Sequence, residues 1–600
     1  MRTVNSAAWL MNCGVHPKPA ASRPGRNSAN KFIKPIRLAL QVLAALFVCG
    51  SASAQEGGIS GSVKEGSNGI GLPGVIIAVQ EYGSGALAGM GATDASGNYF
   101  VRVPSMGKYA LVVSRLGYDN AAAPALIELS EISPHRTANF SMNRSAWPKG
   151  KRTKPVMSWE TGSGKSYAIP AYEIPAFLIL LNRVDRYAYP DLTEDGKNVY
   201  DTNFSTFKDH VFHGRWGADR DSFAMNQFNH PYHGTLYHGF ARSAGLNYWE
   251  SLVYDNAGSL LWETGGETTH PSINDQVASG IGGSFFGEVL FRMANLMLED
   301  DRDGSKPGFW RKFGAAVLSP SAGFNRYAYG DRFKAPFPSN DPSIRWRLQL
   351  GESVKSDLND QGATSTSNRN EATLDYSMDY GMPGKPGYSY DRPFDYFQFE
   401  LTTLGNRSNP VDNIMIRGLL LGKEYEAGNS YQGIWGLYGG YDYISPYIFR
   451  VSSTSLSLGT TYQWSPSQSV SMQGSALGGF GYAAGGNISP EGERDYHYGI
   501  GPQVLLAFRL IVGDTAMFDL TGRTYYLNGK GGIDPGGREV IGRLNMGFTI
   551  RIYDRHALGI QYILSSRDAR YPDRPDSHQK VGTIALVYNL LGHAGLGAIK

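Results

Sequence analysis

The feature that most constrains this chain is a series of long alternating runs in its C-terminal half. From Arg543 to Ile552, for example, apolar residues take every second position, and polar residues or glycine lie between them. Successive side chains of a strand point to opposite faces, so each run predicts a strand with one apolar and one polar face. We predict about twelve strands, near 344–353, 372–380, 395–404, 413–422, 430–441, 446–463, 468–482, 496–510, 515–527, 539–552, 556–566 and 580–590.

The length of these runs and the gaps between them favour a membrane barrel over a soluble sandwich. Runs of about 10 or more residues match a tilted strand that crosses a bilayer. From the seventh run onward the gaps alternate between long and short: 483–495, 511–514, 528–538, 553–555 and 567–579. Outer-membrane barrels have short periplasmic turns, longer outer loops and an even strand number. We therefore predict a transmembrane β-barrel over residues 331–600 with both ends in the periplasm.

One gap does not fit this alternation. Residues 380–394 form a long gap at a place where the pattern calls for a short periplasmic turn. A miscounted strand in this part of the barrel is therefore left open.

The first 54 residues have the pattern of an export signal. Lys31, Lys34 and Arg37 precede an apolar run over 38–48, and Ala52-Ser53-Ala54 precedes Gln55. A run of about 11 apolar residues is shorter than the roughly 20 that a membrane-spanning helix needs. We therefore predict a leader over 1–54, removed before Gln55. Since both cysteines, Cys13 and Cys49, lie in it, we expect a mature chain without disulfides or thiolate metal sites.

Composition narrows the class of protein further. Only 18% of the residues are charged, and the chain contains 75 glycines and 36 tyrosines. This composition excludes a disordered polyelectrolyte and a coiled coil. The chain has 56 Lys and Arg against 53 Asp and Glu, but the leader contains seven of the basic residues and no acidic one. The rest of the chain is thus slightly acidic, so we expect no nucleic-acid partner.

Residues 57–143 are predicted to form a small β-sandwich, because short β-type runs alternate with turn signals. The segments Leu72-Pro73-Gly74-Val75, Thr93 to Phe100 and Leu116-Gly117-Tyr118 resemble those of the carboxypeptidase regulatory-like family. The resemblance implies a transthyretin-like sandwich with a structural or binding role. We expect it to be a periplasmic accessory domain that could contact a periplasmic protein. The polar, proline-containing residues 144–167 predict a linker.

Residues 168–330 combine helix-like stretches with polar motifs. The motifs are His230-Pro231, Ala241-Arg242-Ser243, Trp249-Glu250, Trp262-Glu263 and Pro271-Ser272-Ile273-Asn274-Asp275. In this order they resemble the domain of unknown function 3943 family, over roughly 185–330. The resemblance implies an outer-membrane setting and no known reaction. We predict helices over 234–249, 257–265 and 275–298, so this part should be a short polar helical segment.

The charged residues of this segment allow three interpretations. Acid/base catalysis would use Glu263 or Glu267 as the base, with His230 or His233 as its partner and Asp275 nearby. A metal site is weakly indicated, because His230, His233 and His238 are three and five residues apart and Pro231 suggests a loop. We therefore assign no metal and no cofactor. The third interpretation is a buried polar network that stabilises the helices, formed by His238, Arg242, Asn274, Glu288 and Arg292.

Two classes of function follow. The first is an outer-membrane β-barrel protein with a periplasmic accessory domain, which contacts outer-membrane lipid, is inserted by the barrel-assembly machinery, and acts as a scaffold or passes small solutes. The second is a membrane-embedded hydrolase of envelope lipid or glycan that uses the Glu, His and Asp cluster. No Gly-x-Ser-x-Gly elbow lies in the helical segment, so no serine nucleophile is assigned.

Overall fold

A computed structural model gives the fold, and it describes the chain in two compact units divided near residue 146. The described residues are 57–66, 69–82, 87–115, 118, 126–143, 165–193, 196–219, 221–299, 306–329, 336–357, 369–405, 410–428, 430–446, 448–467, 469–488, 495–529, 537–572 and 574–598. The predicted leader, both cysteines and nearly all of the predicted linker lie outside these residues. No helix in the described ranges is long and apolar enough to cross a bilayer.

The first unit is a β-sandwich of two four-stranded sheets, as the sequence predicts. One sheet contains β1 (Gly57–Glu65), β4 (Asn98–Val103), β7 (His135–Thr137) and β8 (Phe140–Met142). The other contains β3 (Leu87–Ala92), β2 (Ile76–Glu81), β5 (Gly107–Ser114) and β6 (Ile127–Leu129). Alternate residues of the long strands, such as Ile77, Val101 and Val113, fill a common core. The turn before β4 is closed by Asp94, whose Oδ1 accepts hydrogen bonds from the backbone N–H of Ser96 and Asn98 at 2.8 and 2.9 Å.

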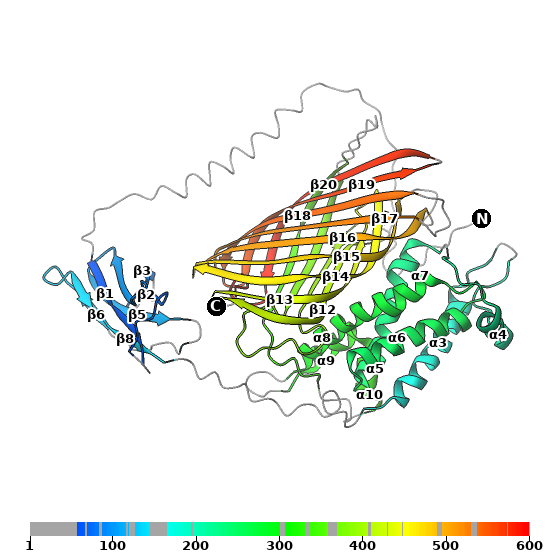
Figure 1. Cartoon of the computed structure of the whole chain (residues 1–600), viewed down its shortest axis with the longest axis horizontal. Helices are drawn as coiled ribbons and strands as arrows, with labels where there is room; N and C mark the ends of the chain where they lie inside the picture. Colours follow the sequence, from blue (N-terminus) through cyan, green and yellow to red (C-terminus); the bar gives the residue numbers. More distant parts are fainter. Residues whose placement is uncertain are drawn as a thin grey trace, which may run out of the picture. The chain divides into compact units, whose positions relative to one another are not determined.

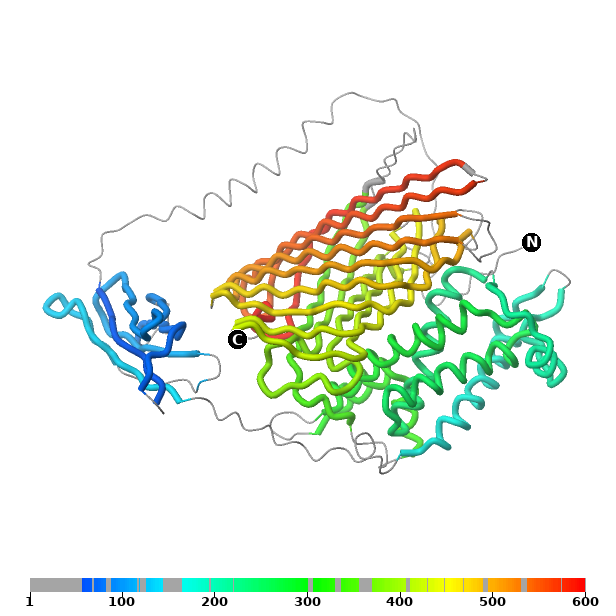
Figure 2. The backbone as a smooth tube through the Cα atoms, in the orientation of Figure 1, coloured from blue at the N-terminus to red at the C-terminus, as the bar shows by residue number. Residues whose placement is uncertain are grey.

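The second unit contains a closed barrel of twelve antiparallel strands, which confirms the predicted number (Figure 1). The strands are β9 (Ile344–Asp357), β10 (Arg369–Tyr380), β11 (Phe397–Leu404), β12 (Val411–Ala427), β13 (Tyr431–Ile444), β14 (Phe449–Ser467), β15 (Val470–Asn487), β16 (Tyr496–Val512), β17 (Ala516–Asn528), β18 (Arg538–Tyr553), β19 (His556–Tyr571) and β20 (Arg574–Leu591). Each strand pairs with the next, and β20 pairs with β9 to close the barrel. Figure 2 shows the strands running obliquely side by side.

Two predicted details of the barrel need correction. The gap predicted over 567–579 is a short turn, because β19 and β20 continue past their apolar part and pair Asp568 with His578. Backbone hydrogen bonds extend a ladder whether or not its side chains are apolar, so alternation understates strand length. The gap after Tyr380 contains no further strand. Its residues fold back on the wall, where the Phe394 N–H donates to the Leu419 carbonyl at 2.6 Å.

The lumen of the barrel is bridged by charged side chains. Arg509 on β16 donates to Asp379 on β10 at 2.7 Å, although these strands lie on opposite sides of the closed sheet. Arg543 on β18 likewise reaches Asp412 on β12 at 2.8 Å. Further pairs join Arg347 to Asp519, Arg523 to Asp442, and Lys355 to Asp412. These contacts stack in tiers along the barrel and connect strands that are not neighbours.

The chain after β20 lies in the mouth where that strand ends. Leu596 is buried against Ile511 and Leu591, and Gln473 donates to the Gly597 carbonyl at 2.8 Å. A cavity of about 440 Å³ remains at this mouth, beside Arg345 and Asp379. A cavity of about 180 Å³ lies at the opposite mouth, beside His497 and Arg567. The ion-pair tiers lie between these two cavities.

The helices that follow the sandwich and precede the barrel in the sequence pack against the outer wall of the barrel and do not enter its lumen (Figure 1). They are α3 (Ala168–Ala188), α4 (Phe204–His213), η1 (Met225–Asn229), α5 (His230–Ser243), α6 (Tyr248–Gly265), α7 (Ile273–Asp275), η2 (Gln276–Gly282), α8 (Gly283–Leu298), α9 (Phe309–Leu318) and α10 (Pro320–Ala328). We call them the helical unit. Phe286 of α8 stacks on Phe399 and Tyr441, with ring centroids 6.4 and 6.0 Å apart. Tyr441, which the helices cover, is 1% exposed. Leu458 also points outward but lies on a part of the wall that the helices leave uncovered, and it is 65% exposed.

The helix predicted over 234–249 is wrong, because the chain forms two helices there. Gly245 has a φ of 91°, which suits glycine and breaks the helix between α5 and α6. Asn247 then caps α6, since its Oδ1 accepts a hydrogen bond from the Glu250 N–H at 2.9 Å. The loop predicted at Pro231 is also wrong. Proline is tolerated in the first turn of a helix, and α5 already begins at His230.

A leucine in place of Gly439 should displace α8 from the wall. A Cβ on this outward-facing glycine of β13 would lie 2.7 Å from the Phe285 ring, so the side chain would clash with α8. Overpacking of this kind costs about 1–3 kcal/mol. In limited proteolysis of the detergent-solubilised protein, we expect Gly439→Leu to speed cleavage of the helical unit while the barrel keeps its heat-modifiable gel migration.

The matched control is Gly478→Leu on β15. A Cβ there meets no atom within 4 Å, so the substitution should leave the cleavage rate unchanged. Equal cleavage of the two variants would contradict the proposed wall contact.

Candidate functional site

The helical unit contains two clusters of buried ionisable side chains. The first, which we call the His238 network, consists of His238, Arg242, Asp255, Glu288, Arg292 and Asp395. His238 on α5 contacts Asp255 on α6 through Nδ1 at 2.7 Å and Glu288 on α8 through Nε2 at 2.9 Å. These three side chains have no solvent exposure, or almost none.

Arginines balance the carboxylates of the His238 network. Arg242 donates to both oxygens of Glu288, at 2.7 and 3.1 Å. Arg292 donates to Glu288 at 2.8 Å and to Asp395, in the segment between β10 and β11, at 3.0 Å. Burial opposes ionisation of Glu288, but the arginines and His238 outweigh it and hold its pKa below the usual range. The network is thus a set of paired charges that also joins α8 to the barrel.

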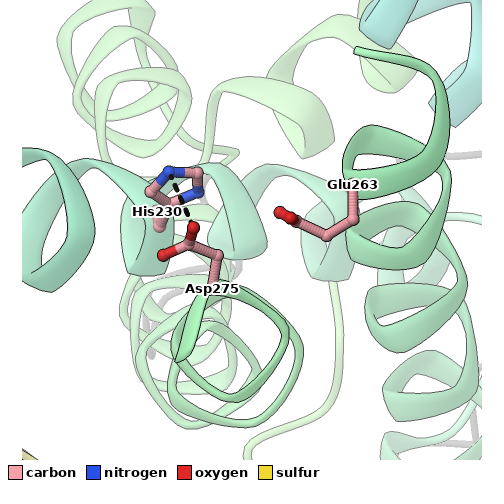
Figure 3. Close-up of side chains that lie close together, drawn as sticks. All are labelled: His230, Glu263 and Asp275. Carbon is pink, nitrogen blue, oxygen red and sulfur yellow. Dashed lines mark ion pairs between the residues drawn. The ribbon is translucent and has the colours of Figure 1, made fainter. Parts of the chain in front are cut away.

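The second cluster, which we call the acidic cluster, consists of Asp219, His230, Glu263, Glu267 and Asp275. Figure 3 shows His230 and Asp275 facing each other, with Glu263 pointing toward them from α6. His230 Nε2 lies 3.9 Å from Asp275 Oδ2. One ligand atom each of His230, Glu263 and Asp275 can be chosen so that all three lie within 4.8 Å of one another. These three side chains are at most 5% exposed.

Hydrogen bonds hold the acidic cluster in place. The Ser272 N–H donates to Glu263 Oε2 at 2.7 Å. The Asn274 amide donates to both Asp219 and Asp275, at 2.9 Å in each case, so it links the two carboxylates. These donors come from the polar motif that follows α6 in the sequence.

Asn226 and Glu267 lie at the edge of the acidic cluster. Asn226 donates to Asp219 and, at 2.9 and 3.1 Å, to the hydroxyls of Tyr496 and Tyr498 on the barrel wall. Glu267 accepts hydrogen bonds from Trp262 Nε1 at 2.9 Å and from Thr269 at 3.0 Å. The barrel wall therefore forms part of the support of the cluster.

The electrostatics of the acidic cluster differ from those of the His238 network. Burial, reinforced by neighbouring carboxylates, raises the pKa of Glu263 and Asp275 well above the usual range and that of Glu267 to about 8. Burial lowers the pKa of His230 to about 4, although Asp219 opposes the shift. Burial, with His230 beside it, lowers the pKa of His233 to about 3. In the described chain no Lys or Arg pairs with Glu263, Glu267 or Asp275.

The structure assigns the candidate residues to these two clusters. Glu263, Asp275 and His230 come together, and Glu267 and His233 lie beside them. The His233 ring packs edge-on against His230 and Trp262 at centroid distances of 5.9 and 6.4 Å. His238, Arg242, Glu288 and Arg292 form the separate His238 network. Asn274, expected in that network, belongs to the acidic cluster.

Sequence reasoning missed four participants: Asp219, Asn226, Asp255 and Asp395. Asp255 could have been found, because Ser251, Asp255 and Trp262 follow a helical spacing on the buried face of α6. No local pattern marks Asp219, Asn226 or Asp395, which reach their clusters through tertiary folding.

Comparison with known proteins confirms both family resemblances. Residues 215–321 match the family described as Domain of unknown function (DUF3943). Residues 58–143 match the carboxypeptidase regulatory-like domain. The acidic cluster and nearly all of the His238 network lie within the first of these matches. No curated protein is significantly similar to this chain.

Solved structures show weak similarity to separate parts of the chain. The pilus 2b backbone protein of group B streptococcus is 17% identical, with 15% of this chain and 42% of that protein covered and a TM-score of 0.13. This chain thus spans less than half of that protein. The NanC porin is 9% identical over 40% of this chain and 98% of the porin, with a TM-score of 0.22. The outer membrane channel DcaP of Acinetobacter baumannii is 8% identical over 41% and 97%, with a TM-score of 0.20.

Stability of the helical unit should fall as the pH rises through the titration of His238. Burial disfavours its imidazolium, but Asp255 and Glu288 outweigh burial and raise its pKa to about 9. Because this folded-state pKa exceeds the ordinary value of about 6.5, the stabilisation is complete below about pH 6.5 and is lost as the pH rises through 9. The shift corresponds to about 3 kcal/mol.

Urea unfolding followed by intrinsic fluorescence in detergent, between pH 6.5 and 9.5, tests this expectation. Tyr248, Asp255 and Glu288, which contact the imidazole, are all retained in His238→Gln, so the variant removes one titrating group from the network. The difference in unfolding free energy between wild type and His238→Gln should shrink across this range. A difference that stays constant would show that His238 does not titrate there.

Proposed function

We propose that this protein is an outer-membrane β-barrel whose closed lumen makes it an anchor for the helical unit and not a path for solutes. The observation that carries the proposal is the set of ion pairs across the lumen, above all Arg509 with Asp379 and Arg543 with Asp412. Each pair joins strands six positions apart in a barrel of twelve. A solute would have to break these buried pairs to pass.

The outer face of the barrel supports a membrane location. On β18 the outward row runs Val540, Gly542, Leu544, Met546, Phe548, Ile550, Ile552, and the corresponding rows of β16 and of the second half of β20 are also mainly apolar. The inward row of β18 contains Glu539, Arg543 and Asn545. An apolar exterior with a polar interior over these strands of 16 to 18 residues is the pattern of a membrane barrel and would be costly in water.

Turn lengths support an orientation. The turns 428–430, 468–469, 513–515 and 554–555 lie at the mouth where β9 begins and β20 ends. The connections 358–368, 488–495 and 529–537 at the other mouth are longer. Two connections depart from this pattern, namely the long 381–396 at the first mouth and the short 572–573 at the other. Short turns face the periplasm in outer-membrane barrels. The sandwich precedes β9 in the chain, so this orientation supports a periplasmic location for it, where it could contact a protein partner.

The helical unit would share the membrane with the barrel. It covers outward-facing residues of β11 and β13 that elsewhere on the wall would meet lipid. On α9, Phe309, Trp310 and Phe313 are exposed on one face, at 70, 76 and 53%. Exposed aromatic residues of this kind suit the boundary between headgroups and acyl chains, and they favour contact of α9 with outer-membrane lipid.

Removing one cross-lumen pair should open the barrel. In planar bilayers we expect wild-type protein to show no steady conductance and the double variant Arg509→Ala/Asp379→Ala to show ion-conducting openings. Removing both members avoids leaving either of them as an unpaired buried charge, which costs roughly 3–5 kcal/mol, while Arg345 loses its bond to Asp379 in the variant. The control removes the half-exposed pair Arg186→Ala/Asp201→Ala of the helical unit and should stay silent. Steady conductance in wild type would refute the closed-anchor proposal.

A second candidate function, hydrolysis of envelope lipid or glycan, is favoured by one observation. His230, Glu263 and Asp275 converge although they come from three separate parts of the chain. Removal of a general base typically costs a factor of 10² to 10⁴ in rate. With phospholipid vesicles as substrate, Glu263→Gln should lower turnover by at least about 100-fold while the folded gel band persists.

The matched control is Glu173→Gln on α3. Glu173 is also a buried carboxyl of the helical unit, with Asn325 as its hydrogen-bond donor. Turnover should be unaffected in this variant. The absence of turnover in wild type would remove lipid hydrolysis and leave the anchor proposal in place.

A further inference from the structure

The two buried clusters of the helical unit differ in whether positively charged side chains pair with their carboxylates. In the His238 network, Glu288 is met by Arg242, Arg292 and His238. In the acidic cluster, Glu263 and Asp275 are equally buried, but the described chain gives them no Lys or Arg partner. Ionised carboxylates are removed from water at large cost unless a positive charge compensates them. The acidic cluster thus lacks the counter-charge that its neighbour contains.

We propose that His230, Glu263 and Asp275 bind one divalent transition-metal ion. Their ligand atoms lie within 4.8 Å of one another, so a small inward movement of the side chains would let a single ion contact all three. One imidazole nitrogen and two carboxylate oxygens form the ligand set, with no sulfur. This site differs from the barrel anchor, and it does not depend on whether the lumen conducts.

Unpartnered polar atoms beside the three ligands provide an independent observation. Asn226 is fully buried, and its Oδ1 has no hydrogen-bond partner even though its amide nitrogen donates to Asp219 and to the tyrosine hydroxyls of β16. Nδ1 of His233, whose ring contacts that of His230, is likewise buried without a partner. Buried polar atoms are nearly always paired, so these two unpaired atoms fit a cluster that binds a cation or a cation-bound water.

The backbone around the site is also unusual. The π-helical segment η1 ends at Asn229, directly before His230, and the π-helical segment η2 begins at Gln276, directly after Asp275. A π-helical turn contains one more residue than an α-helical turn, so it shifts the direction of the side chains that follow it. Such segments often occur at functional sites. Here His230 directly follows one such segment and Asp275 directly precedes the other.

The donor types select the class of metal. Imidazole suits Zn²⁺, Fe²⁺ and Ni²⁺, and carboxylate oxygens suit Mn²⁺ as well, whereas Mg²⁺ and Ca²⁺ prefer oxygen ligands alone. Three protein ligands leave at least one coordination position for water. The Asn274 amide and the Ser272 N–H bond to Asp275 and Glu263, so they orient the carboxylates from outside the ligand set. Zn²⁺ and Mn²⁺ are therefore the ions to test.

The experiment measures metal content and stability of the same protein. Mature full-length chain is purified from membranes in detergent, stripped with chelator and incubated with Zn²⁺ or Mn²⁺, with Mg²⁺ as the comparison ion. Bound metal is then measured by mass spectrometry and affinity by calorimetry. We expect one equivalent of Zn²⁺ or Mn²⁺, weaker uptake of Mg²⁺, and a melting temperature that rises with ion concentration.

Isosteric variants decide whether the three residues are the ligands. Glu263→Gln and Asp275→Asn should each weaken binding by more than about 100-fold, because changes outside the ligand set alone cost roughly 10–100-fold. Both variants should be at least as stable as stripped wild type, since each replaces a buried carboxyl group that has no Lys or Arg partner in the described chain by a neutral amide. This expectation distinguishes a lost ligand from a misfolded protein. The control Glu173→Gln should bind like wild type.

Three results would overturn the proposal. These are a stripped wild-type protein that takes up no stoichiometric Zn²⁺ or Mn²⁺, a Glu263→Gln or Asp275→Asn variant that binds as wild type does, and a Glu173→Gln variant that loses binding together with them. If Glu263→Gln fails to fold, the metal binding of Asp275→Asn and the stoichiometry of the wild-type protein still test whether the site binds a metal ion. Metal binding without lipid turnover would leave the site in place and remove only the hydrolase candidate.

Discussion

Many of the inward-facing side chains of the barrel are charged, and they are buried against one another. A guanidinium group on one side of the lumen reaches a carboxylate on the other, as Arg509 does with Asp379 and Arg543 with Asp412. Most of these charges have a second partner, since Asp379 also pairs with Arg345, Arg509 with Asp519, and Asp412 with Lys355. Breaking a cross-lumen pair therefore disturbs a buried network, at a cost of up to roughly 3–5 kcal/mol. The pairs therefore fix the distance between opposite strands and prevent the barrel from widening into a pore.

The barrel could be predicted from sequence because its signal is local. Alternation of apolar and polar residues depends only on neighbouring positions, and a strand with one lipid-facing and one polar face must show it. The runs ended too early at β19 and β20, where polar residues such as Asp568 and His578 continue the pairing beyond the apolar part. Strand number was thus easier to predict than strand length.

The candidate site could be predicted only in part. Pairs four residues apart on one helix, such as Glu288 and Arg292, were visible, and the structure shows that this pair is in contact. Partners on other elements were not visible. Asp395 reaches Arg292 from the segment between two barrel strands, and Asp219 reaches Asn274 from a loop more than fifty residues earlier. These contacts arise from tertiary folding, which no helical or strand period encodes.

The position of the helical unit on the wall connects the two halves of the molecule. The hydroxyls of Tyr496 and Tyr498 accept hydrogen bonds from Asn226, and Tyr441 donates to the Gln227 carbonyl, so η1 is bound to the barrel immediately before His230. The His238 network joins α8 to Asp395 in the same way. A site that must keep a few side chains within a fraction of an ångström needs a rigid base, and sheet residues provide a more precise base than loops do. A barrel closed by its own ion pairs cannot change diameter without breaking them, so it provides that base for the acidic cluster.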